Sequence, residues 1–486
     1  MPNFDGSQAP ADAERRFDGW PGDPEWKDLT QALVQRAPGA WPGALDDFLR
    51  TTRARKRSMG PRTCRVFVSH QHLDAQRALR IAWLADQNGF EYWLDVHDPV
   101  LRLANSSVLP PPVHSILVAG IIARYPFGGV TWCSLMYLLG LRALGHEVFY
   151  VEDTGECIYD PVENTISKDP GYGTRYIHAA LEPFGLGDRW TFVNWDGTYH
   201  GASHERLRAF CADADLYINL SGGSWFWRDE YARIPRSIFI DSDPVFTQLA
   251  LAKGEGWYVD FFTRFDHLFT FGANIGTPAC DVPTSGFTWH KTWQPIVLDQ
   301  WQTPPGSAGD RFTTVMTWKI ESFADVDGNK DIEFVKFMDV ASRSRQPIEL
   351  AVNGPQGLLR SRGWQTVDAM GVSRSLWDYR AFLQGSKGEF GVAKHAYVSR
   401  RSGWFSDRTE CYLAAGRPAI VQDTGWSAHL PSGEGLVGFS TLEEALEGLD
   451  RVGTDHARHS RMAEAIAREH FDAGRVLPPL LEIAGR

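Results

Sequence analysis

The stretch RRSGWFSDRTECYLAAGRPAIVQDTG, residues 400–425, joins a polar segment to a small-residue helix and then to a buried strand. The helix is predicted to begin at Ser406 or Asp407, whose short polar side chains suit an N-cap, and to run through Gly-Arg-Pro into the strand. Arg408 lies in the first turn, where its planar guanidinium and the helix dipole can act together on an anion. Asp407 could alternatively hold Arg408 in place.

Strands and helices alternate in both directions from this stretch. The same half contains the strand candidates RFTTVMTW, PIELAVNG, GEFGVAK and GLVGFS, and it ends in helical segments. An earlier half begins with the strand HSILVAG, the helix GGVTWCSLMYLLGLRALG and the strand HEVFYVED. The Pro/Gly-rich connector DQWQTPPGSAGD, residues 299–310, separates the halves. This pattern predicts an α/β protein with two Rossmann-like parallel-sheet domains facing across a cleft, with ligands at the carboxyl ends of the strands.

Composition limits the possible functions. The chain has 486 residues, of which 43% are apolar and 22% are charged, so we expect a globular protein of two or three domains. A formal net charge of -11 argues against a nucleic-acid partner, because phosphate binding needs a basic face. The six cysteines contain no C-x-x-C pair, which predicts neither a zinc site nor a disulfide framework. No signal peptide or membrane-spanning run is recognisable, so a cytoplasmic protein is expected.

The N-terminal region differs from the rest of the chain. It is rich in Pro, Gly and charge, and its basic run at 50–65 reads as a solvated linker, or alternatively as a tether for nucleic acid or anionic lipid. From residue 64 the segments CRVFVSH, DAQRALRIAWLADQNG and FEYWLDV predict strand, helix and strand. This segment, about 64–100, resembles the opening of a TIR domain. The NAD-cleaving members carry a catalytic glutamate on a later helix, which is missing before the proline-rich linker at 105–113. The resemblance therefore implies a truncated or remodelled TIR-like module that serves either as an appendage or as a surface that recruits a protein partner.

The first half carries two groups of candidate residues at its predicted strand ends. Gly128 and Gly129 follow the first strand and could bring backbone amides toward an anion or an acceptor, or could only make a tight turn. Asp241 and Asp243, in IDSDP, share one face of the chain at a strand end. They could hold a metal, act as the base that deprotonates an acceptor hydroxyl, or cap the next helix.

Aromatic residues follow another strand of the first half. The segment SWFWRDE, residues 224–230, comes directly after a Gly-Gly pair. Trp225 and Trp227 could stack on an acceptor sugar, while core packing is the competing interpretation.

The second half offers further candidate ligands for a donor. Lys319 ends its first predicted strand, and Glu389 and Lys394 flank GEFGVAKHAY. Lys394 could meet a phosphate oxygen as a point charge, whereas the neighbouring His395 is expected to be structural. After the strand PAIVQ, Asp423 and Thr424 could face a donor sugar or could only form a turn.

Two segments carry a resemblance to a known fold family. GLRALGHEVFYVED resembles the acceptor half of GT-B glycosyltransferases, and ECYLAAGRPAIVQDTG resembles the helix and strand that face the nucleotide diphosphate in their donor half. The blocks PFGGVTW, IDSDPVFTQ, FTFGANIGTP and PSGEGLVGF are similar to a bacterial group of glycosyltransferases. The best-known retaining members begin this helix with two glutamates separated by seven residues. Gly403 and Cys411 occupy those positions here, with Glu410 one residue out of register.

The resemblance implies a metal-independent glycosyltransferase with a nucleotide-sugar as substrate and no further cofactor. The expected domains are an irregular region at 1–63, the TIR-like segment and linker at 64–113, the acceptor domain at 114–298 and the donor domain at 299–486. A sugar-nucleotide epimerase and a TIR-type signalling or defence protein with a ligand-sensing GT-B-like region remain as alternative functions.

Overall fold

The computed structural model describes residues 65–68, 91–94, 114–254, 256–304, 306–319 and 328–485. The contacts divide the chain into two compact units, 1–112 and 113–486. In the first unit β1 (Arg65–Val68) and β2 (Glu91–Leu94) pair in parallel, as a strand-helix-strand unit requires. The predicted helix between them, the basic run and the proline-rich linker lie outside the described residues, so the TIR-like module stays a prediction.

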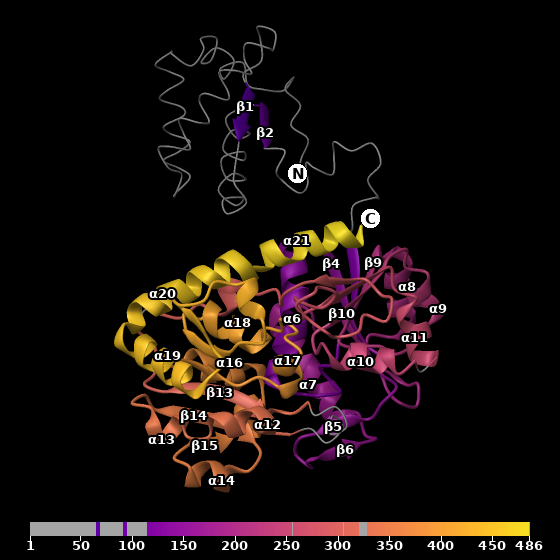
Figure 1. Cartoon of the computed structure of the whole chain (residues 1–486). Helices are drawn as coiled ribbons and strands as arrows, with labels where there is room; N and C mark the ends of the chain where they lie inside the picture. Colours follow the sequence, from indigo (N-terminus) through magenta and orange to yellow (C-terminus); the bar gives the residue numbers. More distant parts are fainter. Residues whose placement is uncertain are drawn as a thin grey trace. The chain divides into compact units, whose positions relative to one another are not determined.

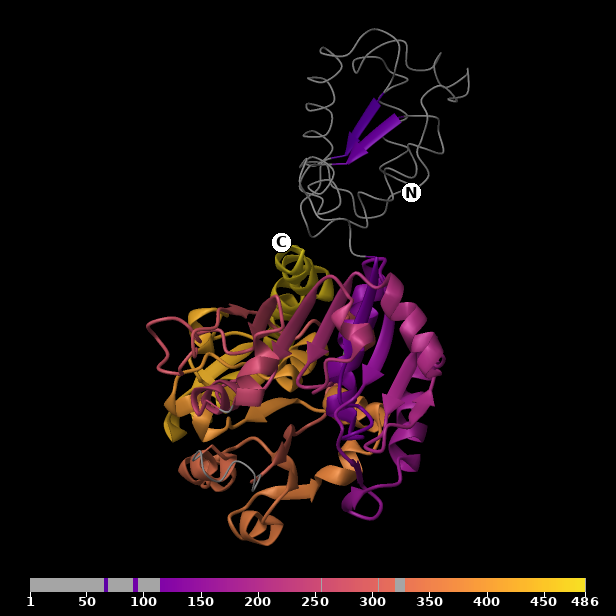
Figure 2. The ribbon, with the colours of Figure 1, turned by 90° about the vertical axis from the view of Figure 1, so that its right-hand side faces the viewer.

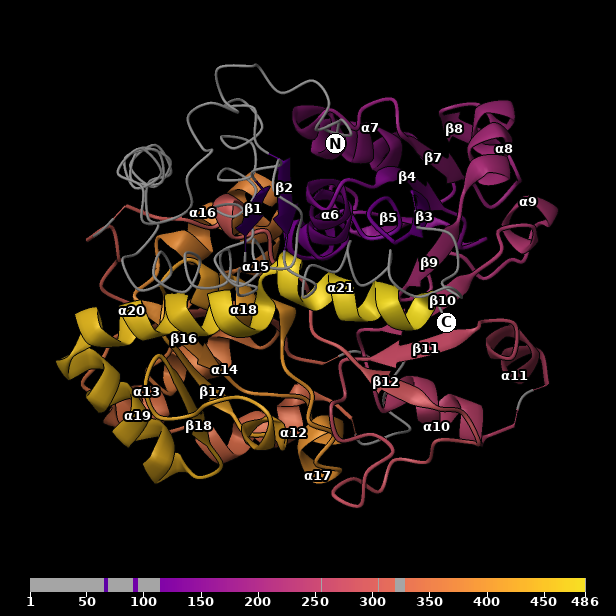
Figure 3. The ribbon, with the colours of Figure 1, turned by 90° about the horizontal axis from the view of Figure 1, so that it is seen from above.

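The first sheet of the second unit, coloured violet to magenta in Figure 1, has eight strands in the order β12-β11-β10-β9-β3-β4-β7-β8, which can be followed in Figure 3. All neighbours are parallel except β7 and β8. From β7 across to β11, the strands follow the doubly wound order in which the chain starts in the middle and builds outward on both sides. The strands are β3 (Ser115–Ala119), β4 (Glu147–Glu152), β7 (Trp190–Val193), β8 (Tyr199–Gly201), β9 (Leu216–Leu220), β10 (Ser237–Asp241), β11 (His267–Thr270) and β12 (Trp289–Lys291).

The second sheet has six parallel strands in the order β15-β14-β13-β16-β17-β18, which is the same winding. Its part of the chain is coloured orange to yellow in Figure 2. Each sheet therefore has one topological switch point, between β3 and β9 and between β13 and β16. The predicted fold class of two Rossmann-like parallel sheets is confirmed, whereas the domain boundaries and the cleft stay predictions. The strands are β13 (Phe312–Thr317), β14 (Ile348–Asn353), β15 (Gln365–Asp368), β16 (Gly388–Gly391), β17 (Ala419–Gln422) and β18 (Leu436–Phe439), and a separate hairpin joins β5 (Ile158–Asp160) to β6 (Thr165–Ser167).

Helices cover the sheets and connect the two halves. The C-terminal helix α21 (Ala473–Ala484) runs from the second half toward the first (Figure 3). It packs on the central helix α6 (Gly128–Ala143), which also contacts α16 (Leu376–Gln384). The other helices are α7 (Gly171–Leu181), α8 (His204–Asp213), α9 (Asp229–Ala232), α10 (Phe246–Ala252), α11 (Gly256–Phe262), α12 (Lys330–Phe334), α13 (Val340–Arg343), α14 (Gln356–Ser361), α15 (Ala369–Ser373), α17 (His395–Ser399), α18 (Asp407–Ala414), α19 (Leu442–Thr454) and α20 (His456–Ile466).

One hydrophobic core cluster contains residues from both halves. Trp132 of α6 is a buried member of it: its ring centroid is 5.2 Å from that of Trp301, and its indole N–H donates to the Leu376 carbonyl at 2.7 Å. Trp301 is fully buried although it belongs to the predicted Pro/Gly-rich connector. The two sheets thus share apolar packing as well as a chain connection. Among the described residues, no helix has the length and apolarity that crossing a bilayer requires.

Candidate functional site at the carboxyl ends of the two sheets

The two sheets contact each other through charged side chains at their strand ends. Asp243 follows β10 in the first sheet, and Lys394 follows β16 in the second, as the N-cap residue of α17. The Lys394 ammonium donates to both Asp243 oxygens, at 2.7 and 2.9 Å, and the Tyr397 hydroxyl donates to the same carboxylate. The side chains of Asp243 and Lys394 are 43% and 17% exposed. The candidate base and a candidate donor ligand are therefore bonded to each other.

Asp241 has different surroundings from Asp243. Its buried carboxylate accepts hydrogen bonds from Thr247 Oγ1 and Gln248 Nε2, both at 2.8 Å, and from Thr270 Oγ1 at 3.3 Å. Burial raises the pKa of Asp241 to about 6. Because its oxygens are used to hold the start of α10 and the end of β11, Asp241 supports the turn that carries Asp243.

The turn around Asp243 is conformationally strained. Val245 has a φ of 76°, which is unfavourable for a β-branched side chain, and its amide is held by Gln248 Oε1 at 2.6 Å. Ser221, with a φ of 55°, has its hydroxyl 2.5 Å from that of Ser242. From the second half, the indole N–H of Trp404 donates to the Ser242 carbonyl at 3.3 Å. Such strain persists only where the surrounding structure fixes the backbone, and it is concentrated at functional sites.

Arg408 lies at the switch point of the second sheet. Its Nε donates to Glu389 Oε1 at 2.7 Å, and one terminal nitrogen donates to the Val315 carbonyl at 2.9 Å. It thereby joins α18 to β16 and to β13, the two strands that flank the switch point. Its side chain is 13% exposed, and Glu389 is fully buried. The ion-pair partner of Arg408 is thus Glu389, whereas the sequence suggested Asp407.

Lys330 is a third cation near this point, and sequence analysis missed it. It opens α12 and is 8% exposed. Burial lowers its pKa well below the ordinary value, and the positive charges of Arg408 and Lys394 lower it further. No sequence signal separates Lys330 from a surface lysine, because its burial depends on residues from distant segments. We call three basic residues the cation cluster: Lys330, Lys394, which is paired with Asp243, and Arg408, which is paired with Glu389.

The start of α18 is buried. Ser406 is its N-cap residue by backbone position, although its hydroxyl caps no backbone amide and lies 3.4 Å from Asp407 Oδ1. Burial raises the pKa of Asp407, and burial next to Asp407 raises the pKa of Glu410 well above its ordinary value. This helix start therefore combines acidic groups with Arg408 in a low-dielectric region.

The other predicted donor ligands have local partners. Asp423 accepts from the Gly425 amide at 2.8 Å and from Ser427 Oγ at 2.6 Å, which is the turn role that the sequence left open. Thr424 is buried and donates to the Trp404 carbonyl at 2.5 Å. Lys319 is exposed just beyond the end of β13.

His395 lies beside the cation cluster in a structural role. Its Nδ1 is 2.5 Å from Glu333 Oε1. Burial tends to raise the pKa of Glu333, but hydrogen bonds from Lys336, His395 and Gln422 outweigh it and hold that pKa below the ordinary value.

Asn274 joins the two halves and was also missed by sequence analysis. It lies in FTFGANIGTP of the first half, and its Nδ2 donates to the carbonyls of Arg401 at 2.9 Å and Gly425 at 3.3 Å. Its amide donates to the Ser402 carbonyl at 3.0 Å. A Cβ on Gly403 would lie 2.8 Å from the Asn274 nitrogen, so the close approach requires glycine there.

The predicted acceptor glycines pack against a helix of the second half. A Cβ on Gly128 would lie 2.4 Å from the Tyr379 Cβ and 2.5 Å from the Ser375 carbonyl oxygen. At Gly129 the nearest atoms, in the Tyr379 ring, would be 3.3 Å away. Their position thus explains the glycines by close helix packing, while acceptor binding by these residues stays a prediction.

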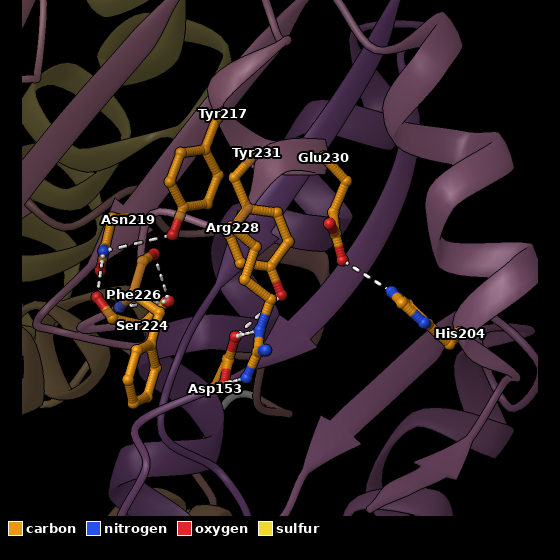
Figure 4. Close-up of polar contacts among 9 residues, drawn as sticks. All are labelled: Asp153, His204, Tyr217, Asn219, Ser224, Phe226, Arg228, Glu230 and Tyr231. Carbon is orange, nitrogen blue, oxygen red and sulfur yellow. Dashed lines mark hydrogen bonds and ion pairs between the residues drawn. The ribbon is translucent and has the colours of Figure 1, made fainter. Parts of the chain in front are cut away.

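The segment SWFWRDE forms a polar and aromatic cluster at the end of β4 (Figure 4). Arg228 donates two hydrogen bonds to buried Asp153, at 2.5 and 2.8 Å, and Tyr231 donates to the same carboxylate at 3.1 Å. Trp225 and Trp227 are half-buried against the second hydrophobic core cluster. Phe226 is 44% exposed, and the Arg228 guanidinium lies 5.3 Å from its ring centroid. The exposed aromatic side chain of this segment is therefore Phe226.

Metal ligands do not gather in the described part of the chain: no group of three or more His, Cys, Asp or Glu side chains is placed to hold an ion there. The metal independence of the proposed enzyme stays a prediction.

Comparison with known proteins gives structural likeness only. No family model matches the chain, and no curated protein matches it. An alpha-glucosyltransferase solved with UDP and DNA is 12% identical, with 76% of this chain and 99% of that chain covered and a TM-score of 0.46. Anabaena HepE in complex with UDP is 10% identical, with 76% of this chain and 98% of that chain covered and a TM-score of 0.46. AviGT4, a glycosyltransferase involved in avilamycin A biosynthesis, is 13% identical, with 77% of this chain and 97% of that chain covered and a TM-score of 0.42.

Proposed function

We propose that the chain is a GT-B glycosyltransferase that moves a sugar from a nucleotide-sugar donor, bound by the second half, to an acceptor bound by the first. The observation that carries this proposal is the cation cluster at the switch point of the second sheet, next to Asp243 from the first. Ligands of doubly wound sheets bind at such points, and a diphosphate matches several converging cations. A carboxylate beside that position suits proton transfer.

In the proposed reaction, the bond between the anomeric carbon of the sugar and a diphosphate oxygen breaks, and its electron pair stays on the diphosphate. A bond forms between that carbon and an acceptor hydroxyl oxygen, and the hydroxyl proton passes to Asp243. The cation cluster stabilises the charge of the leaving diphosphate, which is usually the largest contribution to such catalysis. The reaction needs no cofactor besides the donor.

Other residues of the second half hold or place the side chains that we propose as donor ligands. Glu389 fixes the guanidinium of Arg408 through one edge, and the Val315 carbonyl fixes it through another. Ser406 and Asp407 set the start of α18, and Lys319 lies beyond the end of β13, which flanks the switch point. In the acceptor half we assign stacking to exposed Phe226 in place of the half-buried Trp225 and Trp227.

The first test is a thermal-shift panel of nucleoside diphosphates and their sugars. A true donor at 100 times its dissociation constant should add about 2.7 kcal/mol of stability, while the matching nucleoside without phosphates should add far less. If no compound on the panel shifts the unfolding temperature, the proposed function is wrong.

The second test asks whether Arg408 binds the diphosphate. Arg408→Ala alone leaves buried Glu389 without its partner, so Arg408→Ala combined with Glu389→Gln is the variant that separates binding from folding. The double variant should fold and should lose roughly 1.5 to 3 kcal/mol of donor affinity, or about one to two decades. The matched control is Glu389→Gln, which keeps Arg408 and should retain most of the affinity.

A further inference from the structure

The Asp243 carboxylate is fully engaged by the second half. Two hydrogen bonds from Lys394, at 2.7 and 2.9 Å, reach both of its oxygens, and Tyr397 donates to one of them. An acceptor hydroxyl that is to donate its proton to Asp243 must therefore compete with Lys394 and Tyr397 for the carboxylate oxygens.

Lys394 is also one member of the cation cluster. Lys394 follows β16, and Arg408 is bonded to Glu389 of the same strand, so both cations are held at one of the two strands that flank the switch point. The ammonium of Lys394 also lies 4.9 Å from the ring centroid of Phe246 and 5.3 Å from that of Tyr397. The same ammonium thus contacts the Asp243 carboxylate and lies near the position that we propose for the diphosphate.

We propose that the donor diphosphate and Asp243 compete for Lys394, so that donor binding separates the Asp243 carboxylate from its ammonium partner and allows it to act as base. This inference rests on the proposed function. It orders the reaction: the donor binds first, and the base becomes effective only when a sugar is present to be transferred. An acceptor hydroxyl that enters an empty site meets a carboxylate that is still paired.

The backbone keeps Asp243 in position after Lys394 has turned away. Val245, with its φ of 76°, is fixed by Gln248, and the carbonyl of Ser242 accepts from the Trp404 indole. These contacts involve neither Lys394 nor the carboxylate of Asp243. The carboxylate can therefore lose its cation without a change in the turn that presents it.

A double-mutant cycle on the full chain tests the competition, with isothermal titration of inorganic pyrophosphate and of UDP, GDP, ADP and dTDP. Asp243→Asn should raise the affinity for pyrophosphate, and for whichever nucleoside diphosphate binds, by about three- to tenfold, because the competitor for Lys394 is gone. In a Lys394→Met background, Asp243→Asn should change neither affinity. An equal rise in both backgrounds would mean that overall charge is responsible, and would overturn the inference.

Tyr397→Phe is the matched control. It removes one hydrogen bond from Asp243 but keeps the Lys394 pair and the aromatic ring beside Lys394, so pyrophosphate affinity should stay within about twofold. A rise as large as that of Asp243→Asn would contradict the competition. Asp243→Ala carries the same expectation should the Asn variant fail to fold. If none of the probes binds the wild type, the proposed function fails; if they bind but Asp243→Asn has no effect, only the competition fails.

Discussion

At the residue scale, Asp241 and Asp243 differ in role although they are two positions apart in IDSDP. The sequence places both at a strand end, and it cannot tell which carboxylate the neighbouring segments will cover. Asp241 is covered by Thr247, Gln248 and Thr270, whereas Asp243 remains 43% exposed and meets Lys394. One aspartate is thus part of the scaffold, and the other is part of the candidate site.

The pH dependence of stability should report the burial of Asp241. Its pKa in the folded protein is about 6, above the ordinary value, so the folded state binds its proton more tightly than the unfolded state. Its contribution is therefore fully present below about pH 4 and is lost as pH rises toward 6, by about 3 kcal/mol. Asp241→Asn does not titrate, so the unfolding free energy of the variant relative to wild type should rise by that amount between pH 4 and pH 7. Urea unfolding at several pH values measures it, and a constant difference would contradict the raised pKa.

At the scale of elements, the contact between α6 and α16 gives a sharp prediction. Gly128→Ala would place a Cβ 2.4 Å from the Tyr379 Cβ and 2.5 Å from a backbone oxygen, neither of which can rotate away. We expect a loss of about 1 to 3 kcal/mol in unfolding free energy. Gly129→Ala is the matched control, because its Cβ would meet only the edge of the Tyr379 ring, at 3.3 Å, and alanine favours the helix. Equal losses in the two variants would show that the close contact of Gly128 with α16 does not govern stability at this position.

Hydrophobic periodicity was sufficient to predict most of the elements. The runs that became β3, β9, β10 and β17 are mostly apolar and almost entirely buried, as coverage of a parallel strand on both faces requires. The hairpin β5-β6 and the antiparallel edge strand β8 were not predicted, because each of these strands has only three residues and carries no apolar pattern. The order of strands within each sheet also cannot be read from periodicity, since it depends on how the connections cross.

At the scale of the whole molecule, the candidate site is built from residues far apart in the chain. Asp243 and Lys394 are separated by 151 positions, and each was a candidate by itself. Their pairing was not predictable, because it depends on how the two sheets pack. The same holds for Asn274, whose partners Arg401 and Gly425 belong to loops of the other half. The sequence thus identifies which types of residue stand at strand ends, and the packing of the halves decides which of them meet.

Asn274 tests what couples the two halves during unfolding. Asn274→Ala removes the donor for the carbonyls of Arg401 and Gly425 and the oxygen that lies 2.8 Å from His429 Nε2, so buried polar groups lose their partners. We expect a loss of about 3 kcal/mol in unfolding free energy, whereas Thr277→Ala, which removes an exposed hydroxyl bonded to the Asn274 carbonyl, should cost less than about 1 kcal/mol.

The number of calorimetric transitions shows whether the shared apolar core or the Asn274 hydrogen bonds couple the two halves during unfolding. Because Trp132 and Trp301 belong to a core that both halves share, the Asn274→Ala variant should still unfold in a single transition, only at a lower temperature. The hydrogen bonds at Asn274 would then add stability to an interface that apolar burial already makes cooperative. Two separate transitions in the variant, with one in wild type, would instead mean that the Asn274 hydrogen bonds couple the sheets and that the shared core is too weak to do so.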